Sequence, residues 1–200
     1  MKKILVTYDT ISNSTKQVAS IINKEIAKLE DVYIDLKLYS DITNLSEYDI
    51  IIIGSPMRFK NFNSAIRNYI AQNKEILQNK KVIYFLTCLY LIRTTENVER
   101  EFSVFIDPSF DAVPKSFRKM NIMDKTHCDM QYIDTVLKNA INPKAIGFFK
   151  GKLDLKSLGL FSRLFIFMRI VTLLTKKEQV GDFLNPTSVS QWTKTLKNVF

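Results

Sequence analysis

Histidine and cysteine are scarce in this chain, and their scarcity excludes several kinds of site. His127 is the single histidine among 200 residues, so a metal centre built from histidines is excluded. The two cysteines, Cys88 and Cys128, lack the spacing of a metal or redox motif, and we expect two free thiols rather than a disulfide. No nucleophile–base–acid triad and no pair of carboxylates stands out.

The chain also shows no repeat, no low-complexity stretch and no apolar leader. Met1-Lys-Lys-Ile-Leu-Val enters a strand pattern at once, from which we expect a cytoplasmic protein. The apolar content of 46% suits a packed core, and the length suits one domain over residues 1–200. The net charge of +9 favours acidic partners, but without a polybasic run it does not select among nucleic acid, anionic lipid and carboxylated ligands.

Short apolar runs alternate with helical patterns along most of the chain. Strands are expected at residues 4–6, 32–38, 49–54, 81–88 and 144–149, and helices near residues 14–29, 64–77 and 187–200. This alternation predicts an α/β fold with a doubly wound five-stranded parallel sheet in the order 2-1-3-4-5. Ligands of such sheets bind at the carboxyl ends of the strands, where residues 9–15, 54–63 and 87–95 would meet.

Hydroxyl side chains cluster between the first predicted strand and the following helix, at Thr10, Ser12, Ser14 and Thr15. A helix N-terminus with unpaired amides is an anion site, to which these hydroxyls would add donors. The loop contains no lysine and no Gly-Lys-Ser/Thr follows, which disfavours a nucleoside triphosphate and favours a phosphate monoester held by neutral donors. Ordinary helix capping explains the same residues, so both interpretations stay open.

Two segments exceed a minimal version of this fold. Residues 96–130 form an insertion after the fourth strand, beginning with a helical pattern at Val98, Phe102 and Phe105. Residues 157–177 predict a helix whose apolar arc is wider than one sheet face needs. This helix is short for a membrane span and carries two arginines, so burial within the protein or a dimer and contact with an anionic membrane surface remain the alternatives.

Two stretches resemble known flavoproteins. The loop of Thr10 to Thr15 resembles the FMN-phosphate loop of flavodoxins, with Asn13 where that family has glycine; asparagine tolerates the left-handed backbone better than other residues with a side chain. Ile53-Gly-Ser-Pro-Met-Arg-Phe-Lys-Asn-Phe-Asn-Ser-Ala65 and the run from Tyr84 to Arg93 are similar to the menaquinone-dependent protoporphyrinogen IX dehydrogenase family. Residues 96–130 look longer than that family's connection.

The resemblance implies a flavodoxin-like fold that binds FMN, and an oxidoreductase acting on a porphyrinogen or another planar carboxylated substrate with a quinone as electron acceptor. It implies no metal and no nucleic-acid partner, leaves a homo-oligomer open, and is compatible with a peripheral position at the inner face of the membrane through residues 157–177. The cofactor-binding residues it implies are Thr10, Ser12, Asn13, Ser14, Thr15, Pro56, Met57, Arg58, Phe59, Thr87, Cys88 and Leu89.

Arg58 is the candidate catalytic residue, because a cation beside the flavin would favour its reduced anion or pair with a substrate carboxylate. Phe59 would stack on the ring. The alternatives are a solvent-facing Arg58 and a core Phe59. Two other functions also remain open: an electron carrier without its own substrate, and a binding protein that has kept the fold and lost the cofactor.

Overall fold

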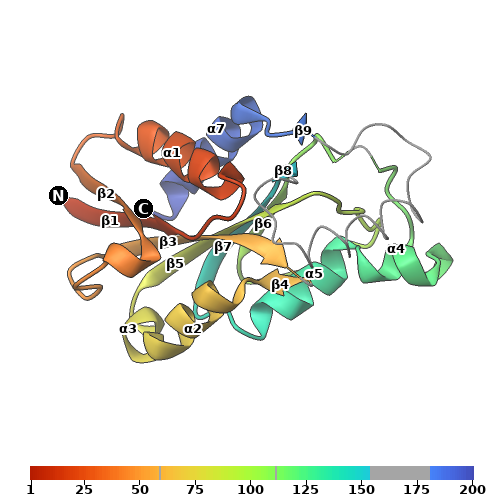
Figure 1. Cartoon of the computed structure of the whole chain (residues 1–200), viewed down its shortest axis with the longest axis horizontal. Helices are drawn as coiled ribbons and strands as arrows, with labels where there is room; N and C mark the ends of the chain where they lie inside the picture. Colours follow the sequence, from red (N-terminus) through yellow and green to blue (C-terminus); the bar gives the residue numbers. More distant parts are fainter. Residues whose placement is uncertain (59, 111, 154–180) are drawn as a thin grey trace.

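The structure, a computed structural model, describes residues 1–58, 60–110, 112–153 and 181–200. Its centre is a parallel sheet in the order β2-β1-β3-β5-β7-β6 (Figure 1). The strands are β1 (Lys2–Tyr8), β2 (Val32–Leu38), β3 (Ile50–Arg58), β5 (Lys81–Cys88), β6 (Ser103–Ile106) and β7 (Pro143–Lys150). The predicted α/β fold and the order 2-1-3-4-5 are confirmed, because β2, β1, β3, β5 and β7 follow that order.

Helices cover both faces of the sheet (Figure 1). On one face lie α1 (Ser14–Ile26) and α7 (Pro186–Thr195), the latter continued by the 3₁₀ turn η4 (Leu196–Asn198). On the other lie α2 (Ser64–Gln72), α3 (Lys74–Gln78) and α5 (Asp129–Leu137). Each face has its own apolar core, so both sides of the central strands are buried, as their continuous apolar sequences predict.

The inward faces of the first and last helices agree with their sequence periodicity. Val18, Ile22 and Ile26 of α1 are fully or almost fully buried. In α7, Trp192 is 1% exposed and its ring centroid lies 5.3 Å from that of Phe149 in β7. The predicted 187–200 helix is therefore confirmed, although its α-helical part ends at Thr195.

The prediction of a helical start to the insertion at Val98, Phe102 and Phe105 is wrong, because none of the three residues lies in a helix. Residues Ser103–Ile106 instead form β6, a parallel edge strand beside β7. Its side chains alternate between faces: Val104 and Ile106 pack against one core, whereas Phe105 packs against the other. The side chains of this segment therefore alternate as in a strand rather than following helical spacing. Pairing with β7 makes β6 the sixth strand of the parallel sheet.

Smaller elements complete the described chain. They are β4 (Asn61–Phe62), β8 (Lys152–Leu153), β9 (Gly181–Asp182), α4 (Ile122–Thr126), η1 (Tyr39–Asp41) and η2 (Phe117–Lys119). β4 pairs antiparallel with the end of β3, so most of the predicted 54–63 loop is a strand extension and a hairpin. β8 and β9 pair with each other.

The predicted apolar helix at 157–177 lies outside the described residues. Within the ranges that the structure does describe, no helix is long and apolar enough to cross a membrane.

Close packing at Gly54 gives a test of the fold. A Cβ at this position of β3 would overlap the ring of Phe85 in β5, which is completely buried. We expect Gly54→Ala to lower the free energy of unfolding by about 1–3 kcal/mol, because overpacking a dense core forces its neighbours to move. Chemical denaturation measures the loss. Phe85→Leu in the Gly54→Ala background should recover part of it, and a double variant less stable than Gly54→Ala would contradict this explanation.

Candidate functional site

The turn from β1 into α1 contains a residue whose backbone is in the left-handed conformation. Asn13 has φ 68° and precedes Ser14, the first residue of α1. The expectation that Asn13 takes the backbone conformation of a glycine is therefore confirmed. No side chain in the described part of the chain caps this helix N-terminus, and its first turn contains no acidic residue. Its unpaired amides and the positive end of the helix dipole favour an anion here.

The hydroxyl group of Thr10 is a second feature of this turn that indicates a ligand site. The hydroxyl oxygen is buried and has no hydrogen-bond partner among the residues that the structure describes, although the residue as a whole is half-buried. Leaving a buried hydroxyl unpaired is unfavourable, so a ligand that accepts a hydrogen bond at this position would relieve the cost.

The remaining hydroxyls of the loop already bond within the protein. Ser12 donates from Oγ to the carbonyl of Lys152 at 3.0 Å, and its Oγ lies 3.4 Å from that of Ser14. Thr15 is buried with its Oγ1 2.9 Å from that of Thr87. These side chains therefore hold the loop in place, and their backbone amides are the groups left for an anion.

The second predicted loop, residues 54–63, begins within the last part of β3. Pro56 and Met57 are half-buried, and Met57 packs against the core on the α2 side. Arg58 pairs through its backbone with Asn61 in the β3–β4 hairpin. The side chain of Arg58 and the whole of Phe59 lie outside the described residues, so their predicted roles stay predictions.

Asn63 joins two of the predicted loops, and sequence reasoning missed it. Its Nδ2 donates to Asp9 Oδ2 after β1, and its Oδ1 accepts from the amide of Ile66 at 3.0 Å, which caps α2. Its backbone amide donates to Ser55 Oγ at 3.0 Å. An asparagine directly before the Ser64 helix is a recognisable N-cap signal, but its link to Asp9 is not visible in the sequence.

The third loop places Thr87 and Cys88 at the buried end of β5 and leaves Leu89 41% exposed. Burial, with a smaller contribution from Asp107, raises the pKa of the Cys88 thiol above its ordinary value, so the thiol stays protonated at neutral pH. Both cysteines are free and buried, in agreement with the sequence.

A fourth segment, which the sequence did not suggest, closes over the same end of the sheet. Gly151 follows β7 and donates its amide to the carbonyl of Cys88 at 3.0 Å. A Cβ at Gly151 would lie 3.2 Å from Ser14 Oγ and 3.4 Å from Thr87 Cβ. A glycine is the residue that allows this close approach.

The structure thus brings the loop of residues 9–15 together with Thr87 and Cys88, through the Thr15–Thr87 contact, and with the β3–α2 connection, through Asp9 and Asn63. Within the described ranges, no group of three or more histidine, cysteine, aspartate or glutamate residues is arranged to hold a metal ion.

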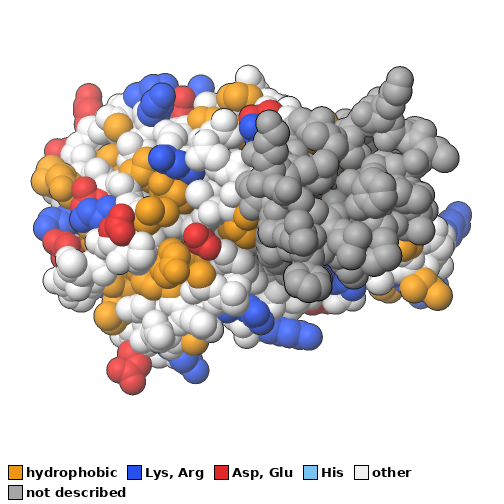
Figure 2. Space-filling model, in the orientation of Figure 1, with side chains coloured by type: hydrophobic (Ala, Val, Ile, Leu, Met, Phe, Trp, Pro, Cys, Tyr) orange, Lys and Arg blue, Asp and Glu red, His pale blue; other side chains and the backbone are white. Residues whose placement is uncertain are grey.

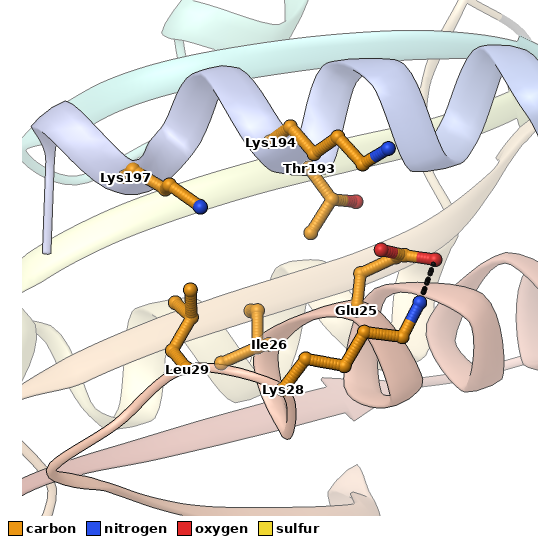
Figure 3. Close-up of a pocket in the computed structure, with 7 residues that line it drawn as sticks. All are labelled: Glu25, Ile26, Lys28, Leu29, Thr193, Lys194 and Lys197. Carbon is orange, nitrogen blue, oxygen red and sulfur yellow. Dashed lines mark hydrogen bonds and ion pairs between the residues drawn. The ribbon is translucent and has the colours of Figure 1, made fainter.

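A cavity of about 140 Å³ lies elsewhere, between the C-terminal ends of α1 and α7 (Figure 3). Ile26 and Leu29 line it together with Lys28, Lys194 and Lys197, and Lys28 pairs with Glu25 at 2.8 Å. The 13 residues of α1 separate this cavity from the Asn13 turn by about 20 Å. Lysines at two helix C-termini offset the negative ends of the helix dipoles, which accounts for them without a ligand.

Comparison with known proteins places the chain in a family. The sequence profile described as a flavodoxin domain matches residues 5–180, and the chain belongs to this family. No curated protein sequence matches the chain.

Solved structures with a similar arrangement include the flavodoxin of Fusobacterium nucleatum bound to flavin mononucleotide, with 16% identity, a TM-score of 0.48, and coverage of 100% of this chain and 99% of that one. Oxidised Flavodoxin 2 from Bacillus cereus has 14% identity, a TM-score of 0.47 and coverage of 99% of both chains. The rubredoxin oxygen:oxidoreductase of Desulfovibrio gigas has 19% identity and a TM-score of 0.39; the match covers 44% of this chain and only 23% of that one.

The Thr15–Thr87 contact offers a test of how the loops are joined. We expect Thr87→Val to lower the free energy of unfolding by about 1–2 kcal/mol, because it leaves the buried Thr15 hydroxyl unpaired. Urea denaturation of Thr87→Val, Thr15→Val and the double variant forms a thermodynamic cycle. The double variant should be more stable than the sum of the single losses predicts, and strict additivity would show that the two hydroxyls do not interact.

Proposed function

We propose that the protein binds FMN non-covalently at the carboxyl ends of β1, β3 and β5, with the phosphate group on the turn that begins α1, and that it works as an FMN-dependent oxidoreductase. The observation that carries the proposal is the unpaired, buried hydroxyl of Thr10 beside an uncapped helix N-terminus without acidic residues. Membership of the flavodoxin-domain family supports it.

The described residues fit a phosphate monoester better than a triphosphate. The amides of Ser14 and Thr15 and the hydroxyl of Thr10 are neutral donors, which suits one phosphate group without a metal ion. Asn13 sets the turn that presents these amides. Ser12 bonds to Lys152, and we therefore assign it a supporting role rather than direct contact with the phosphate.

When bound, FMN would supply the redox chemistry, and the protein's own residues would position it and shape its surroundings. Pro56 and Met57 would border the flavin ring, and backbone groups near Thr87, Cys88 and Leu89 would bind its pyrimidine edge. The Asn63–Asp9 bond would fix the distance between the phosphate loop and the ring-binding loop. The protonated Cys88 thiol has no redox role in this proposal.

For the substrate we propose a planar carboxylated molecule, with a porphyrinogen as the first to be tried and a quinone as electron acceptor. The support is the similarity of residues 53–65 and 84–93 to the protoporphyrinogen dehydrogenase family, together with Arg58 in the second loop. Arg58 would pair with a substrate carboxylate or favour the reduced flavin. The net charge of +9 suits a carboxylated substrate and an anionic membrane surface in which quinone dissolves.

An electron carrier without a substrate is the second candidate, because the flavodoxin-domain family itself supports it. A potentiometric titration separates the two: a carrier is expected to be reduced in two well-separated one-electron steps. Anaerobic turnover of a porphyrinogen, with a quinone as acceptor, would favour the oxidoreductase.

Thr10→Val tests the phosphate site. We expect the dissociation constant for FMN to rise about tenfold or more, because a hydrogen bond to a charged group is lost. Without FMN, the variant should be as stable as the parent or more stable by up to about 1–2 kcal/mol, because it removes a buried hydroxyl that has no partner among the described residues. Titration of flavin fluorescence measures the affinity, and thermal unfolding measures the stability.

Thr7→Val is the matched control. The hydroxyl of Thr7 is also buried and unpaired, but it lies within β1 rather than in the turn. This variant should bind FMN as the parent does. Equal affinity of Thr10→Val and the parent would overturn the role of Thr10, and a parent that fails to bind FMN at all would overturn the proposed function.

A further inference from the structure

In the short helix α4 of the insertion, a charged side chain is buried and apolar side chains are exposed. Its buried residue is Asp124, which is 9% exposed. Its apolar residues face outward, with Ile122 85% exposed and Met123 40% exposed. Ile122 is the most exposed large apolar side chain in the described part of the chain, and Val113 in the same segment is 75% exposed.

Specific contacts of the neighbouring residues hold the side chains of α4 in this orientation. The side chain of Asn121 caps α4 by accepting from the amide of Asp124 at 2.7 Å. Asp124 pairs with Lys115 at 2.6 Å, and Met120 is 5% exposed in a small core with Ile92. The chain therefore buries its neighbouring apolar residue and holds Ile122 and Met123 outside.

Basic residues outnumber acidic ones in the segment that carries these apolar side chains. Residues 113–125, which we name the insertion tip, contain four basic residues and one acidic residue, Asp124, whose charge is paired with Lys115. Arg118 and Lys119 are exposed, and the ammonium group of Lys125 lies 5.2 Å from the centre of the Phe117 ring.

One acidic residue from outside the tip lies against it. Glu96 accepts hydrogen bonds from the hydroxyl of Ser116 and the amide of Phe117, each at 2.9 Å, and keeps its negative charge. With Glu96 and Asp124 counted against the four basic residues of the tip, two positive charges remain in excess. Figure 2 shows apolar side chains, with a basic one nearby, at the end of the molecule where Figure 1 places α4.

We propose that the insertion tip docks on the surface of an anionic lipid bilayer. Ile122, Met123 and Val113 would enter the interface, and Arg118 and Lys119 would reach the phosphate headgroups. Exposed apolar side chains ringed by basic ones are the pattern of interfacial binding, in which burial and attraction to anionic lipid act together. A second copy of the chain is a poorer occupant, since it would bring the same positive charge to the contact.

This site lies in a different part of the sequence from the predicted contact through residues 157–177, and it does not depend on FMN. The experiment uses the full-length protein and co-sedimentation with vesicles of phosphatidylcholine alone or mixed equally with phosphatidylglycerol. We expect binding to the mixed vesicles only. Ile122→Ser/Met123→Ser should weaken it about tenfold and Lys119→Gln about fivefold, because apolar burial and one cation near the surface are lost.

Matched controls lie away from the tip. Leu38→Ser removes an exposed apolar side chain at the end of β2, and Lys74→Gln removes an exposed lysine at the start of α3. Both controls should bind vesicles as the parent does. FMN titration of every variant should give one common affinity, which separates failure of the tip from failure of the proposed function.

Four results would overturn the proposal. The first is full vesicle binding by Ile122→Ser/Met123→Ser, and the second is no binding by the parent protein. The third is an equal loss in the two controls. The fourth is a parent dimer in sedimentation velocity that becomes a monomer in the tip variant, which would assign the tip to a second copy of the chain.

Discussion

The left-handed backbone of Asn13 is the constraint on which the candidate site depends. It lets the chain turn from β1 into α1 within a few residues, so the helix begins directly at the carboxyl end of the central sheet. Parallel pairing then aligns the ends of β1, β3 and β5 at the same edge. A helix terminus whose dipole favours an anion and the other loops of the candidate site therefore meet through backbone geometry before any side chain is considered.

Polar contacts between distant segments fix these loops relative to one another. Thr15 contacts Thr87, Asn63 contacts Asp9, and Ser12 bonds to the backbone of Lys152. The hydroxyls of Ser12 and Thr15 therefore hold the loops in position. The backbone amides of the first turn of α1 and the hydroxyl of Thr10 are the groups that could bind a ligand. The proposed site would recognise a dianion without an ammonium group, which is consistent with the absence of lysine from residues 9–15.

Much of the fold could be predicted because its strongest signals are local. The run from Ile50 to Ile53 is apolar at every position and is buried on both faces, and the spacing of Val18, Ile22 and Ile26 places one helix face inward. β6 could not be predicted, because four residues at a sheet edge are strands only through pairing with β7. Local preference at Phe102 and Phe105 pointed to a helix, and tertiary pairing prevailed.

The candidate site could be predicted in outline but not in its contacts. The hydroxyl cluster at residues 10–15 and the strand ends were visible, whereas the bond from Asn63 to Asp9 and the approach of Gly151 join residues far apart in sequence. The same reasoning missed the reversed polarity of α4, because burial of Asp124 depends on its pairing with Lys115. Such contacts depend on the folded arrangement and not on local spacing.

The measurement that tests the central claim most directly is the ³¹P NMR spectrum of FMN with the protein across a pH titration. If the α1 turn holds the phosphate as a dianion through neutral donors, the resonance of bound FMN should differ from that of free FMN and should stay constant between pH 5 and 8. The resonance of a free phosphate monoester moves over this range, because its second pKa is about 6. A resonance that titrates in the presence of excess protein as it does in free FMN would show that the phosphate is not held there, and would contradict the account.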